Sequence, residues 1–120
     1  MLSLIIASMV GTAQPAASTL QAPPPVRARP RQNLASYVRD GDLPMGALEL
    51  GESRTAHFEL LVSAEGRVTG CTILQSSGVA ALDEASCAIM RRRARFEAAR
   101  DSEGKRVGDM IRSSLGWTLR

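Results

Sequence analysis

Apolar and polar positions in the middle of the chain follow a strand pattern in two neighbouring segments. Residues 54–62 are rich in residues that favour β-strands, and residues 67–74 alternate apolar and polar side chains. The four residues between them have turn chemistry, and Gly66 can adopt a positive φ. The pattern predicts a β-hairpin. One face of its second strand carries Cys71 and Ile73, and the other carries Thr72 and Leu74.

Apolar residues recur at helical spacing over residues 79–96. Acidic residues stand near the start of this segment and arginines near its end, which complements the helix dipole. The segment therefore predicts one long helix. Its apolar stripe consists of Leu82, Ala85, Ile89 and Phe96.

Segments on either side complete the expected domain. Residues 33–39 and 42–50 predict short helical turns, the second of which Gly51 can end. Residues 98–105 predict a polar loop, and residues 107–119 predict a closing strand. The order of elements predicts an α+β fold with a small three-stranded, mostly antiparallel sheet, one long helix across one face and a short N-terminal helix.

The first residues have the composition of a targeting segment. Residues 1–13 contain no charged side chain, and their apolar part is about half as long as a membrane-spanning helix. Small residues follow, so the segment predicts a signal peptide that is cleaved after Ala13 or Ala17, with a short uncleaved anchor as the alternative. Either interpretation carries the rest of the chain across a membrane.

A Pro-rich stretch separates this segment from the expected domain. Residues 14–32 hold five of the six prolines and almost no large apolar side chain. Such a composition favours extended conformations and predicts a linker, with a Pro-rich ligand for another domain as the alternative. The folded domain is then expected over residues 33–120.

Composition limits the classes of protein that remain. With 120 residues there is room for one domain, and 44% hydrophobic against 22% charged residues is the balance of a globular chain. A formal net charge of +3 with only 3% aromatic residues is not the signature of a nucleic-acid-binding domain. We expect no nucleic-acid partner.

The two cysteines predict a disulfide. Cys71 lies on the second predicted strand and Cys87 within the predicted helix, and export would place both in an oxidising compartment. Two buried free thiols are the alternative. A metal site would also need His57, and one histidine with two distant cysteines matches no zinc spacing. We expect no metal and no cofactor.

No set of side chains predicts an enzyme. Ser76 and Ser77 have no recognisable base nearby in sequence, so a helix-capping role is favoured over catalysis. Asp83 and Glu84 are neighbours that point in different directions and do not form an acid/base pair. The arginines at the end of the predicted helix have two interpretations, a solvated helix end or a patch for an anionic partner. They are Arg91, Arg92, Arg93 and Arg95.

Several short motifs, in their order along the chain, resemble those of TonB C-terminal domains. The resemblance covers about residues 34–119. It implies a non-catalytic periplasmic domain of the energy-transducer type. The motifs are Asp42-Leu43-Pro44 with Ala47 and Gly51, Gly66-Arg67-Val68, Ser76-Ser77-Gly78, Leu82-Asp83, Arg95-Phe96, Ala98-Ala99, Gly104 and Val107.

The resemblance also implies a binding mode. In that family the last strand lies at a sheet edge beside the first strand, and this edge receives an extended peptide segment of a TonB-dependent outer-membrane receptor by β-strand addition. The favoured alternative is that Ile111, Leu115 and Trp117 are simply core residues, which is compatible with backbone pairing at the edge. The residues that the resemblance assigns to the edge are Val107, Met110, Ile111, Arg112, Ser113, Ser114 and Leu115.

Further expectations follow from the resemblance. Inner-membrane motor proteins and a second copy of the chain are additional candidate partners, and inner-membrane association is the alternative to free periplasmic location. No apolar run of about 20 residues, the length of a membrane anchor, occurs in the sequence. The chain is therefore not expected to transduce energy by itself. The alternative function is a non-catalytic envelope-binding domain that holds peptidoglycan or another anionic surface through its arginines.

Overall fold

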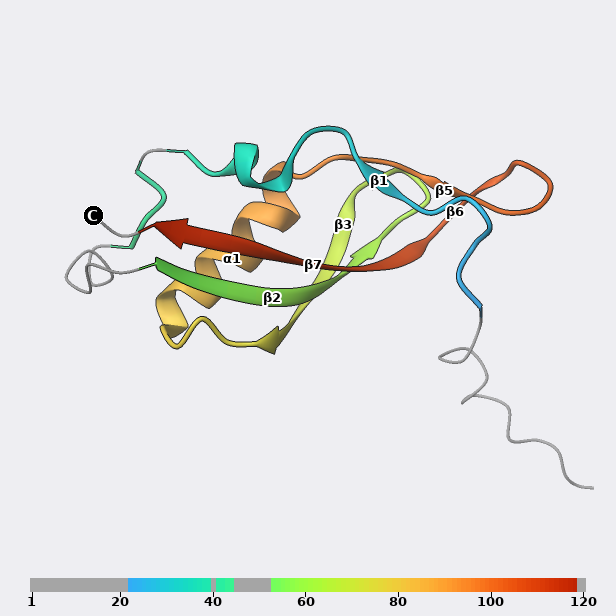
Figure 1. The fold of residues 1–120 in the computed structure, drawn as a ribbon. Helices are drawn as coiled ribbons and strands as arrows, with labels where there is room; N and C mark the ends of the chain where they lie inside the picture. Colours follow the sequence, from blue (N-terminus) through green and yellow to red (C-terminus); the bar gives the residue numbers. More distant parts are fainter. Residues whose placement is uncertain (1–21, 40, 45–52, 119–120) are drawn as a thin grey trace, which may run out of the picture.

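The main sheet and the helix of this protein form an α+β fold (Figure 1). The computed structural model describes residues 22–39, 41–44 and 53–118. Three antiparallel strands, β2 (Ser53–Val62), β3 (Val68–Gln75) and β7 (Asp109–Thr118), form a sheet in the order β3–β2–β7. Helix α1 (Ala80–Arg93) crosses one face of the sheet. The predicted fold class, sheet and long helix are confirmed.

The hairpin of β2 and β3 follows the alternation in the sequence. Its turn has Gly66 at a φ of 81°, as predicted, and the Ser63 hydroxyl accepts hydrogen bonds from the N–H groups of Glu65 and Arg67 at 3.2 Å. On β3, the side chains of Cys71 and Ile73 are partly buried and pack against the core, whereas Thr72 and Leu74 are exposed. The predicted faces of this strand are therefore confirmed. The inward face of β2 consists of Ala56, Phe58, Leu60 and Val62, all buried.

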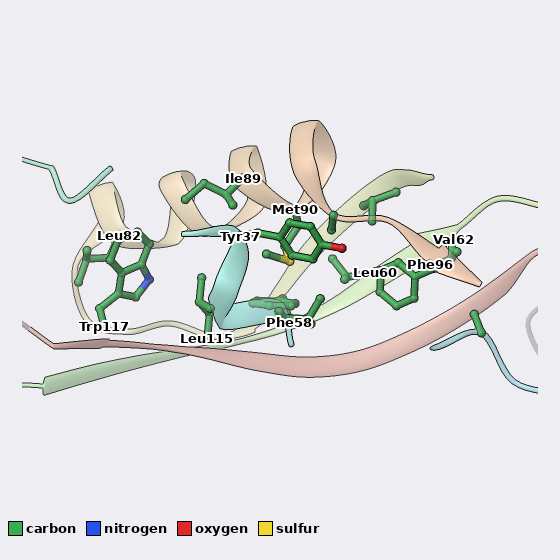
Figure 2. Close-up of a cluster of buried hydrophobic side chains, with 14 of the residues drawn as sticks. Tyr37, Phe58, Leu60, Val62, Leu82, Ile89, Met90, Phe96, Leu115 and Trp117 are labelled. Carbon is green, nitrogen blue, oxygen red and sulfur yellow. The ribbon is translucent and has the colours of Figure 1, made fainter. Parts of the chain in front are cut away.

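The core lies between this sheet face and α1 (Figure 2). The helix contributes Leu82, Ile89 and Met90, which pack among Phe58, Leu60 and Leu115. Trp117 closes the core at one end and Phe96 at the other. Fully burying side chains of this size stabilises a fold by about 1.5–3 kcal/mol each, so this layer is the main source of stability.

The helix is shorter than predicted at its C-terminal end. It stops at Arg93, because Ala94 adopts an extended ψ of 137°. Phe96 belongs instead to the short strand β4 (Phe96–Glu97), where its N–H donates to the carbonyl of Gly66 at 2.9 Å. The expected extension of the helix to Phe96 is wrong, since an apolar residue at helical spacing reaches the core equally well from a strand.

The predicted loop over residues 98–105 is also wrong in part. Two short strands, β5 (Ala99–Arg100) and β6 (Arg106–Val107), pair as a hairpin, and its turn has Gly104 at a φ of 80°. The closing strand therefore begins later than residue 107. It starts after Gly108, at Asp109.

The segment that precedes the predicted domain packs against it. Strand β1 (Arg29–Pro30) pairs antiparallel with β4, Val26 forms a bridge with Arg100, and Ala28 is buried in the core cluster. The expected linker over residues 14–32 is therefore not a free spacer throughout, because its C-terminal half contacts the domain. The predicted signal segment and the first part of the predicted linker lie outside the described residues.

The short N-terminal helix takes the form of a 3₁₀ helix, η3 (Leu34–Tyr37). The side chain of Asn33 caps it by accepting from the N–H of Ala35, and Leu34 and Tyr37 are buried. The second predicted helical turn, over residues 42–50, falls mostly outside the described residues.

Candidate functional site

Strand β7 lies at an edge of the main sheet. It pairs with β2 over its whole length, in an unbroken register that runs from Val62 opposite Asp109 to Ser53 opposite Thr118. Within the described ranges no strand pairs with the other side of β7. This outer side is the feature that the resemblance assigned to binding.

The contacts of Met110 show which backbone groups face outward. Its carbonyl accepts a hydrogen bond from Nη2 of Arg27 at 2.8 Å, and its N–H donates to the carboxylate of Asp109 at 2.7 Å. Neither partner lies on β2, so Met110 points its backbone groups away from β2. In a regular strand the residues alternate in this respect. Arg112, Ser114 and Gly116 therefore present their N–H and C=O groups on the outer side as well.

The pairing of β2 agrees with this assignment. The carbonyl of Leu61 faces β3, where it accepts a hydrogen bond from Oγ1 of Thr69 at 3.4 Å. The neighbouring Leu60 and Val62 must then face β7, and they stand opposite Ile111 and Asp109. We call the outward backbone groups of Arg112, Ser114 and Gly116 the open edge.

The side chains of β7 divide between the two faces of the sheet. Leu115 and Trp117 are buried and belong to the core, and Ile111 packs partly against it. Ser113 is half-buried. Met110, Arg112 and Ser114 expose their side chains on the face away from α1, where Gly116 adds none.

Val107 does not lie on this edge. It is part of β6 and stands opposite Ala99 in the second hairpin, separated from β7 by Gly108. This break is not visible in the sequence, because a glycine is tolerated within a strand as well as between two strands.

A groove of about 800 Å³ lies beside the start of β7, on the face of the sheet away from the helix. Leu61 and Met110 stand opposite each other in the pairing of β2 with β7, and both expose nearly half of their surface there. Glu59 and Arg112 pair next to them at 3.2 Å. Residues 22–24 also line the groove. The groove thus offers an apolar floor next to one ion pair.

Arg27 and Asp109, which no sequence motif marks, close one end of the edge. Arg27 donates from Nε to the carboxylate of Asp109 at 2.9 Å, and the N–H of Ala28 donates to the same oxygen at 2.9 Å. Only 2% of the Asp109 side chain is exposed. Burial alone would raise the pKa of Asp109, but the hydrogen bonds from Arg27, Ala28 and Met110 hold it below its ordinary value. No local pattern reveals such a pair, since its members are 82 positions apart.

The predicted disulfide is confirmed. Cys71 on β3 is bonded to Cys87 on α1, with 5.6 Å between their Cα atoms. The bond ties the helix to the sheet strand that lies farthest from β7.

The arginines at the end of α1 differ in their surroundings. Arg93 forms two hydrogen bonds with the carboxylate of Asp42, at 2.6 and 3.0 Å, and a third with the carbonyl of Tyr37. Arg95 donates to the carbonyls of Arg92 and Ala94. These two side chains serve the fold. Arg91 and Arg92 are exposed, and Arg91 also donates to the carbonyl of Cys71 at 3.5 Å.

The other polar residues considered for chemistry have structural partners. Asp83 accepts hydrogen bonds from the hydroxyl of Ser76 and the N–H of Ser77. The N-cap of α1 is Val79, without a capping side chain, so the expected capping role of the two serines is wrong: they bind the first turn through Asp83 instead. His57 is an exposed residue of β2. Among the described residues no group of three or more His, Cys, Asp or Glu could hold a metal ion.

Residues 42–112 match the family described as the Gram-negative bacterial TonB protein C-terminal. The chain belongs to this family. The match covers β2, β3, α1 and the first part of β7. The search of curated proteins finds no match.

Membership of the TonB C-terminal family fixes the broad class. The family consists of periplasmic interaction domains of Gram-negative bacteria that serve transport and engage outer-membrane receptors, and it is not a family of enzymes. No helix in the described part of the chain is long and apolar enough to cross a membrane.

Proposed function

We propose that this TonB C-terminal domain binds an extended segment of an outer-membrane receptor as an added strand on β7, in support of energised transport. The observation that carries the proposal is the open edge, where the backbone groups of Arg112, Ser114 and Gly116 face away from β2. Unpaired strand groups of this kind are a template for a partner strand.

The opposite edge of the sheet is a poorer template. Strand β3 has register shifts against β2 on both sides of its central part, and such irregularities interrupt pairing. In addition, Arg91 reaches from α1 to the carbonyl of Cys71 on that edge. Bulges and charged side chains are common means of protecting sheet edges. Strand β7 has a regular register, so an added strand is expected there rather than on β3.

The test is binding of short synthetic peptides that tile the periplasmic N-terminal segments of outer-membrane receptors. Ser114→Pro removes one outward N–H and leaves the ladder with β2 intact, because proline is tolerated on the solvent side of an edge strand. We expect it to weaken peptide binding at least about tenfold, which corresponds to about 1.4 kcal/mol. Isothermal titration calorimetry measures the change.

Ser114→Ala is the matched control, since it alters the same side chain and keeps the N–H. It should bind as the unaltered chain does. Equal binding by Ser114→Pro and Ser114→Ala would contradict strand addition at β7. Binding that falls steeply with salt and is lost in Arg91→Ala/Arg92→Ala would favour the alternative, an anionic envelope component.

We further propose that the chain is exported, and that inner-membrane motor proteins and a second copy of the chain are additional partners. N-terminal sequencing of the mature protein would test cleavage after Ala13 or Ala17. Sedimentation at increasing concentration would test a homodimer, which would compete with peptides if it used the same edge. Co-purification with inner-membrane motor proteins would test the remaining partner.

A further inference from the structure

One end of β7 is already occupied by the chain itself. Nη2 of Arg27 donates to the carbonyl of Met110, and the Met110 N–H donates to Asp109. Both outward groups of Met110 are thus satisfied before any partner arrives. The next outward groups along the strand belong to Arg112.

The pair that occupies this position is built into the fold. The side chain of Asp109 is almost fully buried and accepts hydrogen bonds from Arg27, from the N–H of Ala28 and from the N–H of Met110. On either side of Arg27 the chain is held to the domain, by the bridge of Val26 with Arg100 and by the pairing of β1 with β4. In Figure 1 this segment crosses the end of the sheet at which β7 begins. Displacing Arg27 from Met110 would therefore mean breaking several contacts together.

We infer that the Arg27–Asp109 pair sets the register of the bound partner: an added strand pairs with Arg112, Ser114 and Gly116 and ends before Met110. This inference rests on the proposed function. From Arg112 to Gly116 the paired stretch is about 13 Å long, at about 3.3 Å per residue. The partner is thus a short extended peptide with free N–H groups at alternate positions, which excludes proline there. Arg27 and Asp109 act as positioning residues, because they need not touch the peptide.

Amide hydrogen exchange, followed by NMR on the full chain, tests the inference. The probe is the tightest-binding receptor peptide from the titrations above. We expect the peptide to slow exchange at Arg112, Ser114 and Gly116 and to leave the rate at Met110 unchanged. Slower exchange at Met110 in the unaltered chain would overturn the inference.

Substitution of the pair provides the second arm. In Arg27→Ala/Asp109→Ala the outward groups of Met110 are free, so the peptide should now slow exchange at Met110 as well. Arg29→Ala, in the same segment, is the matched control and should keep the original pattern. Exchange at the buried amides of β2 checks that the double variant is folded.

The two proposals fail in different ways. Protection of the open edge that extends to Met110 without any substitution, or that is identical in the double variant, contradicts the role of the Arg27–Asp109 pair and leaves strand addition standing. If no tested peptide slows any outward amide of β7, strand addition is wrong and the inference falls with it.

Discussion

At the scale of single residues, Ser86 links the helix to the last strand inside the core. Its side chain has no exposed surface. The hydroxyl donates to the carbonyl of Leu82 at 2.8 Å and accepts from Nε1 of Trp117 at 2.8 Å. The indole N–H, which is buried with its ring, therefore depends on this serine for its hydrogen bond.

Ser86→Ala should lower the free energy of unfolding by about 1–3 kcal/mol, because it leaves a buried donor without a partner. Urea denaturation followed by Trp117 fluorescence measures the change. Ser114→Ala, on the exposed face of the sheet, should leave stability within about 0.5 kcal/mol. A Ser86→Ala protein as stable as the Ser114→Ala protein would show that the indole N–H finds another partner.

Gly66 has both a positive φ and a close neighbour. A Cβ at this position would lie 2.1 Å from the carbonyl oxygen of Phe96. Gly66→Ala should therefore cost roughly 3 kcal/mol or more in free energy of unfolding, through backbone strain and a clash that only movement of β4 can relieve. Thermal and urea denaturation measure it.

Gly104 provides the control for Gly66. It has nearly the same φ, 80° against 81°, but nothing lies within 4 Å of its Cβ position. Gly104→Ala should cost only the strain of a positive φ, about 1 kcal/mol. Equal losses in the two variants would mean that the approach of Phe96 adds nothing.

Features that depend on neighbouring residues are visible in the sequence, and contacts between distant segments are not. The positive φ of Gly66 is predictable because turn chemistry is local. The contact of Gly66 with Phe96 was not, since it joins segments 30 positions apart along the chain. The same limit hid the Arg27–Asp109 pair. Two motifs of the family resemblance surround these positions and meet in the fold, where Arg67 stands opposite Arg95. They are Gly66-Arg67-Val68 and Arg95-Phe96.

At the scale of elements, long segments were predicted well and short ones were not. Strands β2 and β3 and helix α1 each contain enough residues for their periodicity to be visible. Strands of two residues, such as β4 and β5, show no alternation, and β1 is hidden in a Pro-rich stretch. For the candidate site, the resemblance supplied the choice of β7. Which of its backbone groups face outward depends on the register with β2, which the sequence does not show.

The disulfide is the covalent link between two of these elements. Cys71→Ala/Cys87→Ala should lower the free energy of unfolding by roughly 3 kcal/mol, because the bond closes a loop of 16 positions that restricts the unfolded chain. Denaturation with and without a reducing agent measures the effect. The reducing agent should destabilise the unaltered chain and leave the double variant unchanged. A double variant as stable as the oxidised chain would mean that packing alone holds α1 on β3.

At the scale of the whole molecule, three aspartates join separate segments of the fold. Asp42 holds the segment after η3 to the end of α1 through Arg93. Asp83 holds the loop after β3 to the start of α1, and Asp109 holds the N-terminal segment to β7. Each carboxylate is a stronger hydrogen-bond acceptor when it is ionised than when it is protonated, so all three links share one dependence on pH.

The pKa of each of these aspartates lies below the ordinary value of 3.8. For Asp42 the main cause is the hydrogen bond from Arg93. For Asp83 and Asp109 burial acts in the opposite direction, but hydrogen bonds from Ser76 and Ser77, and from Arg27, Ala28 and Met110, outweigh it. A group whose pKa is lowered by folding stabilises the fold above its unfolded pKa, and this stabilisation is lost as the pH falls through the folded value.

Stability should therefore be nearly constant at neutral pH and fall as the pH decreases toward and below 3.8, where the unfolded chain takes up protons more readily than the folded one. Urea denaturation across that range measures it. Asp42→Asn should be less stable than the unaltered chain at neutral pH, and the difference should shrink in acid, because Asp42 is then protonated in both states of the unaltered chain. Glu103→Gln, in the exposed turn between β5 and β6, removes a charge of the same sign and should not reproduce this convergence. The difference in stability between Asp42→Asn and the unaltered chain could instead stay constant down to low pH. In that case the geometry of the hydrogen bonds, rather than the carboxylate charge opposite Arg93, would account for the contribution of Asp42.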